Sequence, residues 1–125
     1  MGQTEAANRR RAATTEAYDS IFDAAARIVA SEYARPLSLE EVAQRVAISP
    51  RHLQRVFPEV CGLGFRAYVT RIRMCHAANL LATTDLPVNE VGRRVGYAEA
   101  GQFSKAFKRI HHVSPSQARA RPRGS

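Results

Sequence analysis

The sequence predicts an all-α protein of about seven helices, in which two similar subdomains are joined by a long central helix. Apolar residues recur at three- and four-residue spacing along most of the chain, the alternation typical of strands is absent, and one stretch of sequence occurs twice. We expect five segments along the 125 residues: a disordered arm (1–16), a first subdomain (17–63), a linker helix (64–84), a second subdomain (85–121) and a tail (122–125).

Capping residues and prolines mark where the helices begin and end. Arg35-Pro36 ends the first helix, because a proline disfavours helical geometry in the residue before it. Ser38 and Glu41 have the spacing of a capping box. Ser49-Pro50 combines a capping serine with a proline at the first helical position, where its missing N–H costs nothing. The expected helices are, in order, about 17–33, 38–46, one from 50, about 65–81, one from 87, about 100–111 and a last turn from 114.

The repeated stretch predicts two equivalent units. The first copy, at 38–57, reads SLEEVAQRVAISPRHLQRVF, and the second, at 87–107, reads PVNEVGRRVGYAEAGQFSKAF. Each copy fits a helix-turn-helix, in which two short helices cross steeply and need a small residue where their backbones touch. Ala43 and Gly92 supply that contact, and Ala47 and Gly96 are small where the turn leaves the first helix. The expected cores are Val42, Val46, Leu53, Val56 and Phe57 in the first unit and Val91, Val95, Phe103, Phe107 and Ile110 in the second.

The outward faces of the two second helices carry the predicted site. In a helix-turn-helix this helix lies in the major groove of DNA, where its early exposed residues meet base edges. Arg and Lys suit guanine, and Gln suits adenine. For any single residue an ordinary exposed polar face is the alternative. The predicted base contacts are Arg51, His52, Gln54, Arg55, Gly101, Gln102 and Lys105.

The positive charge supports double-stranded DNA as the partner. The net charge of +8 is uneven, because 1–47 hold 6 Lys or Arg against 7 Asp or Glu, whereas 48–125 hold 13 against 4. A basic excess confined to part of a chain is typical of a polyanion partner. Arg73 and Arg93 are either phosphate contacts or members of ion pairs. Phosphate contacts, which give position and affinity rather than specificity, are expected from Arg45, Arg71, Arg94, Lys108 and Arg109.

No cofactor, metal ion, catalytic residue or membrane contact is expected. Cys61 and Cys75 are too few and too isolated for a metal site or a disulfide framework, so we expect them in the core. No apolar run approaches the roughly 20 residues that span a bilayer. The N-terminus also lacks the hydrophobic stretch of a secretory signal. These absences favour a cytoplasmic protein.

The linker helix is nearly long enough to place the two units in successive major grooves. Its 17–20 or so residues span roughly 25–30 Å, slightly less than the spacing of about 34 Å between successive major grooves. We therefore expect that both units bind together only if the DNA bends or one unit loosens.

The chain resembles the DNA-binding domain of the AraC/XylS family of bacterial transcription regulators over about 20–119. The resemblance implies two helix-turn-helix subdomains joined by a long helix, promoter binding in adjacent major grooves, and activation through contact with RNA polymerase. We expect the isolated domain to be a monomer. The matching residues are LQRVF at 53–57, Gly62, the series Tyr68, Arg73, Ala77, Leu80 and Leu81 of the central helix, Val95-Gly96-Tyr97, FSKAFK at 103–108 and Ser114-Pro115.

Three residues depart from the family pattern. Pro58 stands where the family usually has a basic or polar residue, and it should end or kink the first recognition helix. The DNA-contacting face at 51–55 would then be short, and its binding would depend more on base contacts. The face at 101–109 is longer and more basic, so its binding should depend more on phosphate contacts. His112 replaces a usual glycine, so that turn should differ. Ala118 replaces a common aromatic residue, which should weaken docking of the last helix.

Three alternatives to a self-contained regulator remain. The chain can be the DNA-binding part of a longer regulator with a ligand-sensing, dimerising domain, which the upstream reading frame would decide. It can be an enzyme, such as a DNA-repair protein with a similar module, although such proteins use a zinc-holding cysteine cluster that is missing here. It can also be a helical protein-interaction module without DNA binding, which the basic excess argues against.

Overall fold

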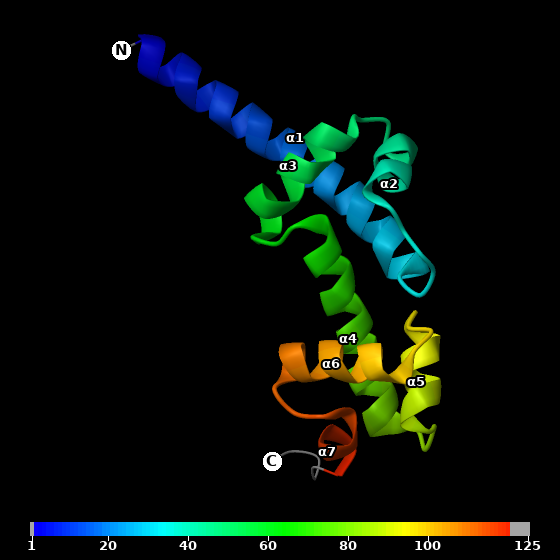
Figure 1. The fold of residues 1–125 in the computed structure, drawn as a ribbon. Helices are drawn as coiled ribbons and strands as arrows, with labels where there is room; N and C mark the ends of the chain where they lie inside the picture. The colour runs from blue at the N-terminus through cyan, green and yellow to red at the C-terminus, as the bar shows by residue number, and fades with distance from the viewer. Residues whose placement is uncertain (1, 121–125) are drawn as a thin grey trace. The chain divides into compact units, whose positions relative to one another are not determined.

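Seven helices and no strand make up the described part of the chain (Figure 1). The structure is a computed structural model that describes residues 2–120, with side chains described at 6, 9, 11 and from 13 onward. The expected all-α class is confirmed. The helices are α1 (Gly2–Glu32), α2 (Leu39–Arg45), α3 (Pro50–Cys61), α4 (Phe65–Thr83), α5 (Val88–Arg94), α6 (Ala100–His111) and α7 (Pro115–Ala120).

Helix α1 begins much earlier than the sequence analysis expects. Residues 2–16 continue the helix instead of forming a disordered arm, so that expectation is wrong. The physical reason is composition, because this segment is rich in Ala, Arg, Glu and Gln, which favour helices, and the first proline is Pro36. The expected tail at 122–125 lies outside the described residues.

The chain divides into two units of packed helices. Among the described residues, the first unit comprises 2–31 and 38–65, and the second comprises 32–37 and 66–120. The linker helix expected to stand between two subdomains therefore belongs, from residue 66 on, to the second unit. The connector 32–37, between α1 and α2, belongs to the second unit as well.

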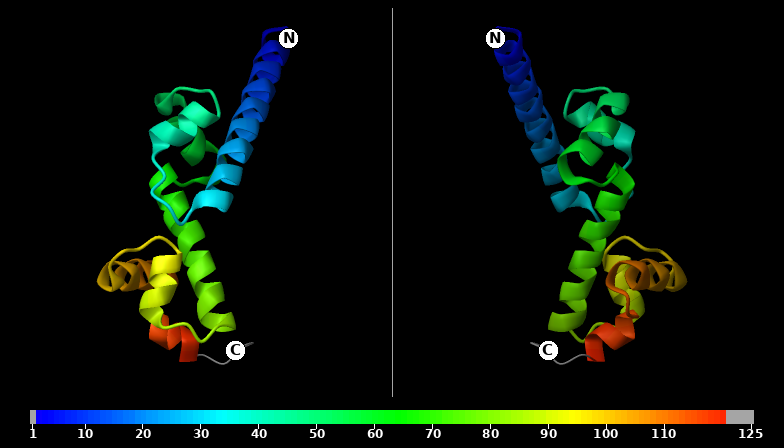
Figure 2. Two further views of the ribbon diagram at one scale, coloured as in Figure 1. Left: turned by 90° about the vertical axis from the view of Figure 1, so that its right-hand side faces the viewer. Right: turned by 90° about the vertical axis from the view of Figure 1, so that its left-hand side faces the viewer.

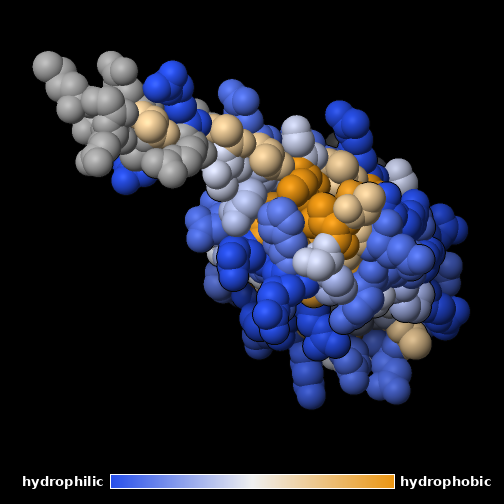
Figure 3. All heavy atoms as spheres, turned by 90° about the horizontal axis from the view of Figure 1, so that it is seen from above, coloured by the Kyte–Doolittle hydropathy of each residue, from blue (hydrophilic) through white to orange (hydrophobic). Residues whose placement is uncertain are grey.

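The first unit is built on the C-terminal half of α1. The N-terminal half of α1 extends beyond α2 and α3 in each ribbon view (Figure 2). Phe57 of α3 lies at the centre, with ring centroids 5.1 Å from Phe22 and 5.4 Å from Phe65, both edge-on. Seen from above, hydrophobic residues gather beside the C-terminal half of α1 within a hydrophilic surface (Figure 3). The buried residues of this unit are Ala25, Val29, Val42, Ala43, Leu53, Val56, Phe57 and Phe65.

The second unit packs α5, α6 and α7 around the C-terminal part of α4. One cluster of buried residues forms its core: Met74, Ala77, Leu81, Val91, Val95, Phe103, Ala106 and Phe107. Of the core residues expected from the repeat, only Val46 and Ile110 are half-buried rather than buried.

Serine caps begin three of the helices. The side chain of Ser38 accepts a hydrogen bond from the Glu41 amide at 3.0 Å, and Ser49 accepts one from the His52 amide at 3.1 Å. Before α7, Ser114 and Gln117 cap each other, since each side-chain oxygen accepts from the other residue's amide. The beginnings of the helices predicted from these serines are therefore confirmed.

Candidate nucleic-acid interface

Helices α3 and α6 are equivalent along their whole length. Each has 12 residues, and each residue of α3 has a counterpart 50 positions later in α6. The same three positions are buried in both helices, Leu53, Val56 and Phe57 in one and Phe103, Ala106 and Phe107 in the other. Because the buried faces correspond, the outward faces correspond too. The repeat thus builds two comparable surfaces from one sequence pattern.

The outward face of α3 carries three of the residues predicted to contact bases. Arg51, Gln54 and Arg55 are exposed and together line a shallow hollow. Arg51 and Arg55 lie one helical turn apart, so their guanidinium groups extend from the same side of the helix. This surface presents two strong donors and one amide to a partner.

His52 does not belong to this outward face. Its ring is half-buried and meets the Tyr18 ring of α1 edge-on, with centroids 5.6 Å apart. At 100° per residue, position 52 lies between the outward Arg51 and the buried Leu53, and the tyrosine of α1 covers that side. His52 is thus less exposed than the other residues predicted on this face, and its contact with a base stays a prediction.

The outward face of α6 is more basic than that of α3. All of the residues predicted there are exposed: Gly101, Gln102, Lys105, Lys108 and Arg109. The counterparts of Lys108 and Arg109 in α3 are Pro58 and Glu59, also exposed. The last turn of α6 thus carries two cations where α3 carries a proline and an acid. The sequence analysis missed Glu59, although the 50-residue offset pairs it with Arg109.

Pro58 lies inside α3 without ending it. The helix continues to Cys61, and the amide of Gly62 donates to the carbonyl oxygen of Pro58 at 2.9 Å. A proline inside a helix removes the bond that its own amide would make to the preceding turn, and its ring crowds the carbonyl group four residues earlier. Of the two outcomes expected at Pro58, an end of the helix is wrong, because α3 continues to the glycine cap at Gly62. A kink at Pro58 stays a prediction.

Two of the residues predicted to contact phosphate occupy one repeat position and pair with an acid one turn earlier. Arg45 lies 3.6 Å from Glu41, and Arg94 lies 3.4 Å from Glu90. Both arginine side chains stay exposed, at 42% and 55%. Exposed ion pairs of this kind contribute well under about 1 kcal/mol to stability. They therefore orient the arginine side chains, which can still bind a phosphate. Arg71 of α4 is also exposed.

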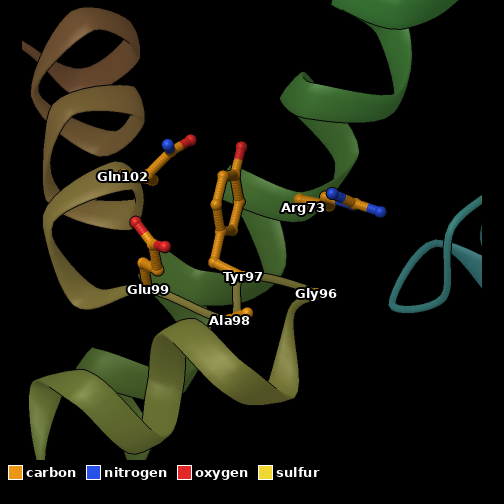
Figure 4. A pocket seen from close by; sticks show the side chains of 6 residues that line it. All are labelled: Arg73, Gly96, Tyr97, Ala98, Glu99 and Gln102. Carbon is orange, nitrogen blue, oxygen red and sulfur yellow. The ribbon is translucent and has the colours of Figure 1, made fainter.

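Arg73 has a structural role in the second unit. Its Nε donates to the carbonyl oxygen of Tyr33 at 2.7 Å, and its Nη2 donates to that of Arg35 at 3.1 Å. The guanidinium also lies 5.6 Å from the centre of the Tyr97 ring. Figure 4 shows the guanidinium on the side of the Tyr97 ring that faces away from Glu99 and Gln102. Arg73 thus holds the connector 32–37 through two of its five N–H donors.

Neither the cysteines nor the described helices indicate another kind of site. Cys61 is half-buried, with its thiol 3.2 Å from the carbonyl oxygen of Phe57, whereas Cys75 is exposed, contrary to the expectation of a core position. Among the described residues, no three His, Cys, Asp or Glu side chains gather where they could bind a metal ion. No helix within 2–120 is long and apolar enough to cross a membrane.

Comparison with known proteins identifies the family. The helix-turn-helix domain family matches residues 42–121, which include α3 and α6. The chain belongs to this AraC-type helix-turn-helix family. The regulatory protein PocR of Salmonella typhimurium is 33% identical over 113 residues, which cover 90% of this chain and 37% of PocR. The transcriptional activator AarP of Providencia stuartii is 38% identical over 80 residues, which cover 64% of this chain and 59% of AarP. The chain thus spans little more than a third of PocR.

Solved structures of AraC-type domains have the same fold. The C-terminal domain of AraT, a response regulator from Geobacillus stearothermophilus, superposes with a TM-score of 0.77 at 36% identity, covering 84% of this chain and 90% of that domain. The DNA-binding domain of AdpA, solved in complex with a target DNA, has a TM-score of 0.74 at 27% identity, covering 80% and 95%. The resemblance to AraC-type regulators is confirmed.

Two of the departures from the AraC-type pattern change less than expected. His112 takes φ +66°, and its amide donates to the Lys108 carbonyl oxygen at 2.8 Å, as the amide of Gly62 donates to Pro58. The turn is therefore the one that a glycine makes, at a cost of about 1–2 kcal/mol for a side chain in this conformation.

The last helix is docked in spite of Ala118. This residue packs against the core of the second unit, and Arg119 donates to the carbonyl oxygens of Leu81 and Thr84, both at 3.3 Å. These bonds tie α7 to the end of α4, a contact that the sequence analysis did not anticipate.

Proposed function

We propose that this chain is the sequence-specific DNA-binding module of a transcription activator, and that it inserts α3 and α6 into adjacent major grooves. The observation that carries the proposal is the equivalence of the two helices, which present polar, mostly basic faces from identical buried frameworks. AdpA supports it, because a domain of the same family and fold was solved in complex with a target DNA.

The two outward faces divide the contacts with DNA. Arg51, Gln54 and Arg55 in α3, and Gln102 and Lys105 in α6, read base edges. Gly101 is not required by the packing of the protein, because nothing lies within 4 Å of the Cβ that a larger residue would add. Its missing side chain allows the backbone of α6 to approach the groove. Arg45, Arg71, Arg94, Lys108 and Arg109 contact phosphate. The first unit depends more on base contacts and the second more on phosphate.

The module binds as a monomer and acts through RNA polymerase. One chain already holds two recognition helices, so a second copy is not needed to read two half-sites. AarP, which belongs to the same family, is named as an activator. A second candidate is that the module works within a longer, ligand-sensing regulator, since the chain spans 37% of PocR. Assays with the full product of the gene distinguish the two.

Selection of bound sites from random DNA tests the proposal. We expect the wild type to select one motif with two halves, Arg51→Ala to relax one half and Gln102→Ala to relax the other. Arg27→Ala is the matched control, because this exposed arginine lies on α1, outside both recognition helices. A motif left unchanged by Arg51→Ala and Gln102→Ala would refute the assignment of the two reading faces.

The dependence of binding on salt tests the phosphate contacts. Each phosphate neutralised contributes about −0.9 to the slope of log affinity against log salt, so five contacts predict a slope of about −4 to −5. A flat response would instead favour a protein-interaction module without DNA binding.

A further inference from the structure

An acidic residue stands at the beginning of the second recognition helix. Glu99 occupies the N-cap position of α6, with φ −115° and ψ 128°, but its side chain makes no capping hydrogen bond. At the same place before α3, Ser49 caps the His52 amide. Short side chains such as Ser, Asp and Asn suit this role, and a glutamate is too long for it. Capping therefore does not explain why a glutamate stands here.

The carboxylate of Glu99 is available to a ligand. The residue is exposed, and within the described part of the chain its side chain has no hydrogen bond or ion pair. Arg73 and Glu99 line the same shallow hollow, but the guanidinium of Arg73 donates to two carbonyl oxygens. In Figure 4 the Tyr97 ring stands between Arg73 and the side chains of Glu99 and Gln102. Of the six residues that line this hollow, Glu99 is the one that carries a negative charge.

A carboxylate at a DNA interface is selective by its chemistry. It only accepts hydrogen bonds, so it is repelled by phosphates and by the acceptors on the major-groove edges of guanine and thymine. Cytosine is different, because its edge presents the N4 amino group as a donor with no acceptor beside it, whereas adenine places the acceptor N7 next to its N6 amino group. Asp and Glu are the residues that accept from cytosine. An unpaired acid at this place therefore favours one base and penalises others.

Gln102 gives this acid a neighbour with a complementary preference. It follows Glu99 by three residues, a rise of about 4.5 Å along the helix, which is close to the spacing of about 3.4 Å between bases on one strand. Both side chains line the same hollow. They are placed to reach successive bases, and Gln suits adenine.

We propose that Glu99 is a specificity-determining residue, which accepts a hydrogen bond from the N4 amino group of a cytosine adjacent to the base read by Gln102. The inference rests on the proposed DNA binding and adds a residue to the base-reading set. The same negative charge is repelled by DNA that does not offer this amino group. Glu99 therefore also weakens binding to all sequences that lack the cytosine.

The test compares the wild type with Glu99→Gln in site selection and in equilibrium binding to duplexes that differ at the cytosine. Glutamine has the same shape but offers both a donor and an acceptor, so it tolerates every base edge. We expect the preference for cytosine to fall about tenfold, a loss within the range for one base contact, while affinity for unrelated DNA rises.

Asp85→Asn is the matched control. Asp85 is an exposed acid of the same unit, in the loop between α4 and α5. We expect its replacement to raise affinity for all sequences alike and to leave the motif unchanged. A thermal melt accompanies each variant, and an unchanged midpoint in Glu99→Gln shows that the altered preference does not come from a damaged α6.

The outcomes separate this inference from the proposed function. A wild-type motif that Glu99→Gln leaves intact, with affinity raised equally for all sequences as in Asp85→Asn, would overturn the role of Glu99 alone. A wild type that selects no motif would overturn both proposals. A wild-type cytosine preference that Glu99→Gln removes would support both.

Discussion

Replacement of Gly96 by alanine tests how the connector 32–37 is held in the second unit. Gly96 has φ +109°, and a Cβ built on it would lie 2.8 Å from the carbonyl oxygen of Ala34 and 2.9 Å from Cζ of Arg73. The Arg73 side chain can move, but the Ala34 oxygen belongs to the backbone. The substitution therefore forces the connector away and stretches the hydrogen bonds from Arg73 to Tyr33 and Arg35.

The expected loss of folding stability in Gly96→Ala has two parts, the strain of a side chain at this φ and the weakened hydrogen bonds of Arg73. A side chain at this φ costs about 1–3 kcal/mol, and the stiffer unfolded chain returns about 0.4–1 kcal/mol. Loss of one hydrogen bond from a charged donor costs about 1.5–3 kcal/mol, toward the lower end here because Arg73 is only half-buried. We expect Gly96→Ala to lower the free energy of unfolding by about 2–4 kcal/mol. The midpoint of thermal unfolding should fall by roughly 8–16 °C.

Chemical denaturation of four proteins measures this effect and its cause. The wild type, Gly96→Ala, Arg73→Ala and the double variant form a cycle in which non-additivity reports the coupling. We expect Gly96→Ala to cost at least about 1 kcal/mol less when Arg73 is already alanine, because the contact to be broken is gone. Additive costs, or a loss below about 0.5 kcal/mol for Gly96→Ala, would refute the reasoning.

Three further predictions concern turns, charge and DNA shape. Ala47→Gly and His112→Gly should each raise the free energy of unfolding by about 0.5–1 kcal/mol in chemical denaturation, because both residues have positive φ. Gly62→Ala is the opposite control and should lower it. A lower free energy of unfolding in the two glycine variants would contradict backbone strain at these positions. Glu59→Gln should tighten binding about two- to fivefold at low salt with an unchanged motif, and no change would place the end of α3 away from DNA. The bent complex expected from the linker length should appear in a circular-permutation gel, and straight DNA with both grooves protected would refute it.

The repeat and the capping residues made most of the fold predictable. The 49- and 50-residue offsets place small, apolar and basic residues at matching positions, and the structure buries matching positions in α3 and α6. The serine caps are local signals that act within one turn. Because both kinds of signal depend on short stretches of chain, they could be interpreted without knowing the tertiary structure.

The features that the sequence did not predict depend on contacts between distant segments. Arg73 reaches the connector 40 residues away, and His52 is covered by Tyr18 of α1. Neither partner shares a motif with the residue that it contacts. The helical character of 2–16 was missed for another reason, since a polar, alanine-rich segment has the composition of both a solvated helix and a disordered arm. Glu59 and Glu99 are acids within or beside recognition helices whose pattern is otherwise basic, so the charge pattern does not predict a role for them.

Missing-contact footprinting of the wild type on its selected site tests the central claim, that two equivalent helices read DNA together. We predict two patches of major-groove contact on one face of the duplex, about 10–10.5 base pairs apart between centres. Arg55→Ala should remove contacts from one patch, and Lys105→Ala, its counterpart 50 positions later, should remove them from the other. A single patch, or loss of the same contacts in both variants, would contradict the account.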